Sequence, residues 1–227
     1  MSNLPQRVLL ALTSQDRLGD DGGPTGYYLP EAAHPWKVFT DAGYEVDFVS
    51  VAGGKPPMIG HDQADEVQND FLADATMQQK LQSTPTAADV KAGDFAAVLY
   101  VGGHGTMWDF PDETGLSDLA REIYETGGVV AAVCHGPAGL VNVTLSNGEY
   151  LVDGKEFAGF TNDEEDAVGM TEVVPFLLQD KLEERGGRHI KEPNFQPCVV
   201  VSERLVTGQN PASAKGVADA MVGILEG

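Results

Sequence analysis

The chain has 227 residues, and its 35 acidic side chains against 14 basic ones give a formal net charge of −21. Such a surface repels the phosphates of nucleic acid and anionic lipid, which argues against both as partners. The sequence contains no apolar run near the roughly twenty residues that a membrane-spanning helix needs, and no signal-peptide pattern at its start. Its two cysteines are too few for a disulfide framework. We therefore expect one cytoplasmic α/β domain over residues 1–227.

Apolar strands alternate with helical segments along most of the chain, which favours a parallel sheet. The expected strands are 8–13, 45–51, 95–101, 129–133, 198–202 and 205–207. The expected helices are 30–42, 65–81, 116–126, 171–185, one that starts at Pro137 and one that starts at Pro211. Residues 108–112 and 161–166 are expected as loops, and residues 52–86 as an insertion over one edge of the sheet.

One stretch combines a buried strand with a reactive side chain. Residues 129–133 are apolar and lead into Cys134, with Ala132 and Gly136 two positions to either side and Pro137 suited to a first helical turn. Small residues at these positions permit a sharp strand-to-helix turn, the cysteine counterpart of a nucleophile elbow. The alternative for Cys134, and the expectation for Cys198, is a structural cysteine in a strand.

Residues 130–137 resemble the elbow of the ThiJ/PfpI superfamily, the group that contains the parkinsonism-associated protein deglycase. Residues 25–35, 102–106, 159–165 and 205–213 resemble one branch of it, the glutathione-independent glyoxalases (glyoxalase III) and heat-shock-protein-31-type stress proteins. The resemblance covers nearly the whole chain. We expect a three-layer α/β/α sandwich with a mostly parallel, flavodoxin-like sheet, similar to class I glutamine amidotransferases. A homodimer without cofactors is implied by the resemblance alone.

The resemblance also implies how Cys134 is activated. It makes His135 the base and, through residues 159–165, places the acid that orients the base at Glu165. Glu164 is the neighbouring alternative, and a solvated surface carboxylate is the plain alternative for either. Together with the helix start, His135 is expected to lower the pKa of the Cys134 thiol below its ordinary value.

Three further residues are expected at the same site. The resemblance places Glu31 against the cysteine sulfur, where it must be protonated because a carboxylate beside a thiolate is repulsive; otherwise Glu31 is an ordinary first-turn acid. Gly103 follows a central strand and is expected to offer its N–H to an oxyanion, while His104 is expected to contact substrate. No helical spacing of ligands stands out, so no metal is expected.

The function implied is a cysteine-dependent lyase that converts methylglyoxal, a small 2-oxoaldehyde, to lactate without glutathione. Protein deglycation would use the same thiolate. A cysteine hydrolase is the alternative enzyme, although the His-x-Glu of glutamine amidotransferases is matched only by His189 and Glu192, one residue too far apart. A stress-related holding chaperone is the alternative from a different class.

Overall fold

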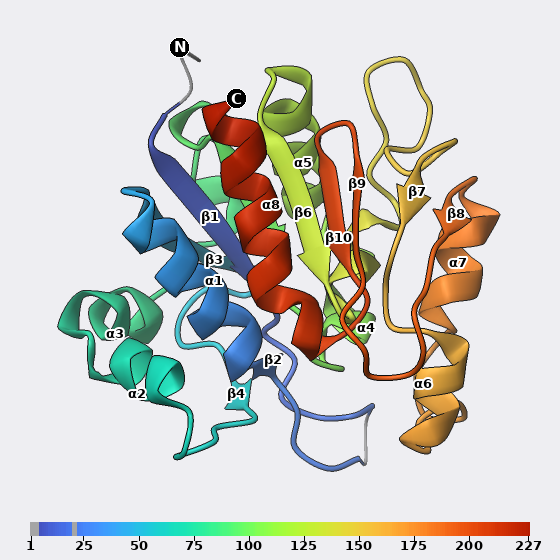
Figure 1. The fold of residues 1–227 in the computed structure, drawn as a ribbon, viewed down its shortest axis with the longest axis horizontal. Coiled ribbons are helices and arrows are strands. Elements are labelled where there is room, and N and C mark those ends of the chain that lie inside the picture. The colour runs from blue at the N-terminus through green and yellow to red at the C-terminus, as the bar shows by residue number, and fades with distance from the viewer. Residues whose placement is uncertain (1–4, 20–21) are drawn as a thin grey trace.

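A six-stranded sheet forms the centre of the computed structural model, which describes residues 5–19 and 22–227 (Figure 1). In spatial order the strands are β3 (Glu45–Ser50), β1 (Arg7–Leu12), β5 (Ala97–Tyr100), β6 (Val129–Val133), β10 (Leu205–Gly208) and β9 (Val199–Ser202). Neighbouring strands are parallel except for β10 and β9, which are antiparallel. Numbered among themselves, the parallel strands have the flavodoxin-like order 2-1-3-4-5.

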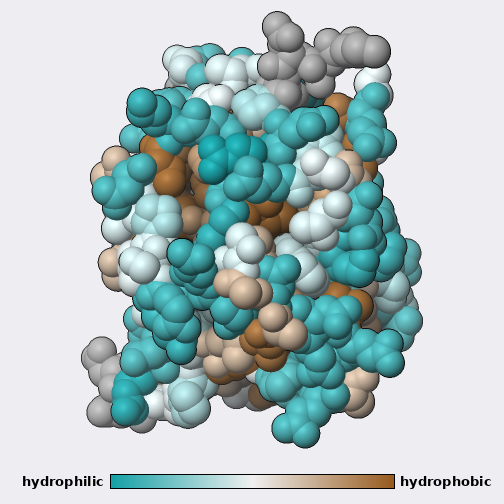
Figure 2. All heavy atoms as spheres, turned by 90° about the vertical axis from the view of Figure 1, so that its left-hand side faces the viewer, coloured by the Kyte–Doolittle hydropathy of each residue, from teal (hydrophilic) through white to brown (hydrophobic). Residues whose placement is uncertain are grey.

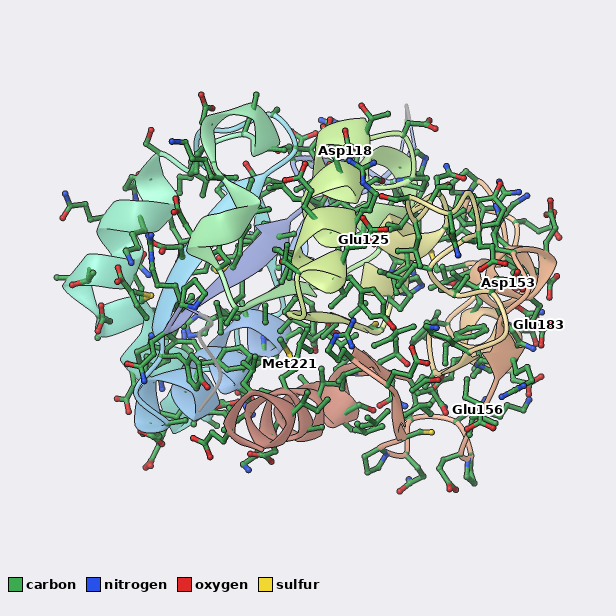
Figure 3. All side chains as sticks on the ribbon, turned by 90° about the horizontal axis from the view of Figure 1, so that it is seen from above. Asp118, Glu125, Asp153, Glu156, Glu183 and Met221 are labelled. Carbon is green, nitrogen blue, oxygen red and sulfur yellow. The ribbon has the colours of Figure 1, made fainter. Side chains whose placement is uncertain are left out.

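Helices cover both faces of this sheet. Helices α1 (Leu29–Asp41) and α8 (Ala214–Glu226) pack beside one another on one face, and α5 (Thr114–Glu125) lies on the other (Figure 3). Met221 is buried on the side of α8 that faces the sheet, as Figure 3 shows. Because both faces are covered, β5 and β6 are buried at every residue and consist of apolar residues and one tyrosine. The predicted three-layer sandwich is confirmed.

Shorter elements complete the described chain. They are β2 (Tyr27–Tyr28), β4 (Met58–Ile59), α2 (Glu66–Ala73), α3 (Ala75–Gln82), η1 (Ala87–Asp89), η2 (Ala92–Asp94), α4 (Thr106–Asp109), η3 (Gly136–Leu140), β7 (Glu156–Phe157), α6 (Asn162–Ala167), α7 (Leu178–Glu184), β8 (Arg188–His189) and η4 (Pro211–Ser213). Residues 52–86 contain β4, α2 and α3, and α3 packs on the edge strand β3 (Figure 1).

Several predicted elements were wrong in detail. The single helix expected over 65–81 is two helices, because Asp74 ends α2 and its side chain accepts the N–H of Met77 to begin α3. The loop expected over 161–166 is helix α6, whose start is fixed by a capping box between Thr161 and Glu164.

Three other boundaries also differ from the prediction. Part of the loop expected over 108–112 belongs to helix α4. The helix expected over 171–185 is reduced to α7, and the one expected at Pro137 is the 3₁₀-helix η3.

Hydrophilic side chains cover most of the face shown in Figure 2, interrupted by small apolar areas. Within residues 5–19 and 22–227, no helix is long and apolar enough to cross a bilayer.

Candidate active site

Cys134 occupies a strained turn between β6 and η3. Its φ is 60°, a left-handed conformation that is rare for residues other than glycine. The turn is held from β10, because the N–H of Cys134 donates to the carbonyl of Gly208 at 2.9 Å. A Cβ at Gly136 would collide with the carbonyl oxygen of Tyr100, so a glycine is required there. The elbow thus raises the cysteine above the carboxyl ends of the sheet, where it remains only 5% exposed.

His135 and Glu165 extend from this cysteine as a chain of contacts. The Nδ1 atom of His135 lies 3.4 Å from the Cys134 sulfur. Its Nε2 atom lies 2.8 Å from Oε2 of Glu165, which α6 supplies from its first turn. Both His135 and Glu165 are buried. This geometry corresponds to a nucleophile, a base and an orienting acid.

The pKa values of the acid and the base define their resting protonation states. Although burial opposes ionisation, hydrogen bonds from His104 and His135 lower the pKa of Glu165 to about 2. Burial lowers the pKa of His135 to about 4, with a further contribution from His104. At neutral pH the neutral His135 ring therefore donates its Nε2–H to the Glu165 carboxylate. This leaves Nδ1 unprotonated and facing the sulfur.

Glu31 lies against Cys134 at the buried start of α1. Its Oε2 atom accepts the N–H of Gly102 at 2.8 Å. Its Oε1 atom has no hydrogen-bond partner among the described residues, and the carboxyl group is near enough to the Cys134 thiol to change its pKa. Burial raises the pKa of Glu31 to about 8, which favours the protonated carboxyl at neutral pH.

The expected low pKa of Cys134 is not supported. Burial raises the pKa of the thiol, any ionised fraction of Glu31 raises it further, and the backbone N–H of His135 lowers it. The site therefore rests as a neutral thiol beside a neutral imidazole. A nucleophilic role for Cys134 would require the thiol to transfer its proton, and Nδ1 of His135 is the acceptor that faces it.

Gly103 and His104 lie in the loop after β5, next to the elbow. Gly103 has a φ of 110°, and a Cβ there would collide with the carbonyl oxygen of Gly26. The ring of His104 packs on that of His135 with centroids 4.0 Å apart, and its Nε2 atom lies 2.9 Å from Oε1 of Glu165. One carboxylate thus binds both imidazoles. Of the two rings, only that of His104 is open to solvent, with 23% of its side chain exposed.

Glu164 and Glu165 point in different directions. Only Glu165 contacts His135, whereas the carboxyl of Glu164 accepts hydrogen bonds from Gln209 at 3.0 Å and Asn210 at 2.8 Å. The geometry therefore distinguishes two acids that the sequence left as alternatives. His189 packs against Phe157, with centroids 5.1 Å apart, and is not part of this chain of contacts.

Some residues at the site were not predicted. The hydroxyl of Thr106 donates to the carbonyls of both Gly103 and His135, each at 2.9 Å, and so connects the two loops. The ring of Phe160 packs on His135 with centroids 4.3 Å apart. Its N–H donates to the carbonyl of Cys134 at 2.9 Å. Position 160 lay inside a segment that carried the resemblance, but a lone aromatic residue there gave no signal of this contact.

The same site contains a set of metal-ligand atoms. Among the described residues, His104, His135 and Glu165 form a group whose ligand atoms all lie within 4.8 Å of one another. Two imidazoles and a carboxylate suit Zn²⁺. However, the 2.8 and 2.9 Å separations from Glu165 are those of hydrogen bonds, so an ion would have to displace the protons that now connect these groups.

The fold and sequence were compared with known proteins. The model of the DJ-1/PfpI family matches residues 25–223. The chain is 36% identical to the protein named glutathione-independent glyoxalase HSP31 from Saccharomyces cerevisiae, over 94% of this chain and 95% of that protein. It is 34% identical to glyoxalase 3 of Candida albicans, over 97% of this chain and 98% of that protein.

Solved structures agree with these relatives. Rapid Encystment Protein 24 kDa from Francisella tularensis is 37% identical, with a TM-score of 0.93 over 96% of this chain and 98% of that one. Glyoxalase III from Candida albicans is 32% identical, with a TM-score of 0.85 over 96% of each chain. The family model covers most of the chain, and the relatives match over nearly their full length and share the fold. The chain therefore belongs to the DJ-1/PfpI family.

Proposed function

We propose that this protein is a glutathione-independent glyoxalase, a cysteine-dependent lyase that converts methylglyoxal and related 2-oxoaldehydes to 2-hydroxy acids. The names of the yeast relatives support this activity. The observation that carries it is the position of His135, whose Nδ1 atom faces the Cys134 sulfur while Glu165 occupies Nε2. A base in this position can both activate the sulfur and move a proton between two neighbouring carbon atoms.

The first step forms a bond between the sulfur and the substrate. Cys134 transfers its proton to Nδ1 of His135, and the thiolate adds to the aldehyde carbon to give a hemithioacetal. The carbonyl oxygen takes this proton from the imidazolium as it becomes a hydroxyl group, which leaves His135 neutral for the next step. The Glu165 carboxylate stabilises the imidazolium that forms, because it lies 2.8 Å from Nε2.

The second step is an internal proton transfer followed by hydrolysis. His135 removes the proton from the carbon bonded to sulfur, which gives an enediolate. It returns this proton to the neighbouring carbon, while the hydroxyl proton on the first carbon passes to the oxygen of the second, and the product is a thioester of the 2-hydroxy acid. Water cleaves the thioester and regenerates the thiol, so the net reaction of methylglyoxal is the addition of one water to form lactate. In this mechanism the N–H of Gly103 holds the developing oxyanion and protonated Glu31 donates to sulfur or oxygen.

The deciding experiment supplies methylglyoxal without any added thiol and measures lactate. We expect the wild-type protein to form lactate and the Cys134→Ala variant to form none. A Cys198→Ala variant is the matched control and should retain activity, because Cys198 contacts the carbonyl of Ile190 instead of the site. Absence of lactate with folded wild-type protein would contradict the proposal.

A homodimer and a cytoplasmic location are further proposals, carried by the resemblance to the family. Analytical ultracentrifugation tests the first, and a monomer at working concentration would reject it. Fractionation of cells that express the protein tests the second.

A further inference from the structure

Phe195 combines two properties that are unusual for a phenylalanine. Its φ is 63°, a left-handed conformation that bulky residues rarely adopt. Its side chain is also 48% exposed, although it is large and apolar. Strain of this kind persists only where the surrounding structure enforces it, and it gathers at ligand-binding sites.

A buried carboxyl group enforces this conformation. The N–H of Phe195 donates to Oε1 of Glu164 at 2.7 Å, and Glu164 is fully buried. The same oxygen accepts the side-chain amides of Gln209 and Asn210. Asn210 in turn donates to the carbonyl of Gln196 at 2.8 Å. The backbone around Phe195 is therefore fastened to the end of β10 as well as to α6.

The segment that precedes Phe195 is fastened in the same way. The N–H of Glu192 donates to Oε1 of Gln209 at 2.9 Å, and Lys191 forms an ion pair with Asp163 of α6. Residues 191–196, here called the strap, thus run beside α6 with fixed attachments (Figure 1). The buried carboxyl group of Glu164 therefore holds the backbone of the strap with one oxygen and the start of α6 with the other.

The strap brings its aromatic ring to the His135 side of the candidate active site. The rings of Phe195 and Phe160 have centroids 6.5 Å apart. Phe160 packs on His135 at 4.3 Å and on His104 at 5.9 Å. Cys134, His135 and Phe160 are buried, whereas His104 and Phe195 keep exposed surface. A chain of ring contacts therefore runs from His135, through the buried Phe160, to the solvent-exposed ring of Phe195.

We propose that Phe195 is a specificity-determining residue that contacts the substituent on the ketone carbon of 2-oxoaldehydes. It favours aromatic and larger apolar substituents over the small methyl group of methylglyoxal. This rests on the proposed glyoxalase function. Once the aldehyde carbon is bonded to Cys134, the substituent is the part of the substrate that extends away from the sulfur. A flat aromatic side chain at that place gains contact area with a phenyl group and very little with a methyl group. Glu164 is a positioning residue, because it holds the backbone of Phe195 and has no contact with the substrate in this arrangement.

The test compares phenylglyoxal with methylglyoxal, both without added thiol. We expect Phe195→Ala to lower the ratio of kcat/KM for phenylglyoxal to kcat/KM for methylglyoxal about tenfold, mostly through a higher KM for phenylglyoxal. Phe195→Leu keeps an apolar side chain and should give an intermediate ratio. Val201→Ala removes an equally exposed apolar side chain, 49% exposed on the edge strand β9, and should leave the ratio unchanged.

The outcomes separate this role from the proposed function. Wild-type protein that forms product from both aldehydes, together with an unchanged ratio in Phe195→Ala, would overturn the specificity role alone. A change of oligomeric state without a change of ratio would also overturn it, because Phe195 would then be a contact between subunits. Wild-type protein that forms product from neither aldehyde would overturn the proposed function and this role with it.

Discussion

Oε2 of Glu165 lies 2.8 Å from Nε2 of His135, although the two residues come from different parts of the fold. Glu165 stands in the first turn of α6, and His135 stands in the turn that follows β6. Because Glu165 is the charged partner, it sets which nitrogen of His135 carries the proton. The unprotonated nitrogen is consequently the one that faces Cys134 at 3.4 Å. This tautomer is the basis of the proposed mechanism, and it can be tested by changing the acid alone.

Glu165→Gln should lower kcat for methylglyoxal on the order of a hundredfold, with a smaller change in KM, because a neutral amide neither fixes the His135 tautomer nor stabilises its imidazolium. Steady-state rates of lactate formation at varied methylglyoxal concentration measure the changes in kcat and KM. Asp166→Asn is the matched control, since Asp166 is the next acid along α6 and is exposed. Equal activity in the two variants would remove Glu165 from the mechanism.

The pH dependence of kcat/KM should show its acid limb well below the ordinary histidine range. His135 must be neutral to accept the thiol proton, and burial lowers its pKa to about 4. Activity should therefore be retained as the pH falls from 7 to 5 and be lost near pH 4. A rate profile with an acid midpoint near 6.5 would show that His135 is not buried and neutral during turnover.

Glu31→Gln should change the pH dependence of stability. Burial raises the pKa of Glu31 from 4.5 to about 8, so its contribution to stability is fully present below pH 4.5 and is lost as the pH rises through 8. Across that interval the wild type should lose on the order of 3–5 kcal/mol relative to Glu31→Gln, at about 1.36 kcal/mol for each pKa unit. Urea unfolding of both proteins between pH 4.5 and 8.5 measures this difference. Parallel curves would place the Glu31 pKa near its ordinary value.

Treatment with EDTA should leave glyoxalase activity unchanged, because the proposed mechanism uses no metal. Added Zn²⁺ should inhibit reversibly, since the ligand atoms of His104, His135 and Glu165 lie within 4.8 Å of one another and Zn²⁺ would occupy the base. His104→Gln should weaken this inhibition about tenfold by removing one ligand. Loss of activity on chelation alone would contradict the metal-free mechanism.

Glu164→Ala should destabilise the protein by on the order of 3 kcal/mol, because it leaves the N–H of Phe195 and the amides of Gln209 and Asn210 without their acceptor. Thermal or urea unfolding measures the loss. Glu164→Gln keeps an acceptor oxygen and should lose less stability. If both variants have the same free energy of unfolding as the wild type, the strap does not depend on this carboxyl group.

The sequence predicted those parts of the molecule in which pattern and chemistry are local. The apolar run before Cys134 and the small residues around it were sufficient for the elbow, and the alternation of strands and helices was sufficient for the layers. The prediction of a loop at 161–166 was wrong, because its four consecutive acidic residues are typical of a solvated loop. In the structure Thr161 and Glu164 cap a helix, and the buried Glu164 accepts hydrogen bonds from Gln209, which follows β10, and from the strap.

The protonation state of the Cys134 thiol could not be predicted from the sequence either. The helix start and His135 predicted a low pKa for Cys134, but burial and Glu31 together raise it. Depth of burial depends on every segment that packs around the residue, and a motif does not contain that information. Phe195 was missed for a related reason, since its left-handed backbone is enforced by a carboxyl group from another part of the chain.

The hydrogen bond from Cys134 to Gly208 has a consequence for how the protein is made. During synthesis the elbow leaves the ribosome well before β10, and before the Gln209 and Asn210 amides that bind Glu164. Until that last strand pairs with β6, the turn at Cys134 lacks the bond that holds its backbone. The complete site can therefore form only after the C-terminal segment has been synthesised and has joined the sheet.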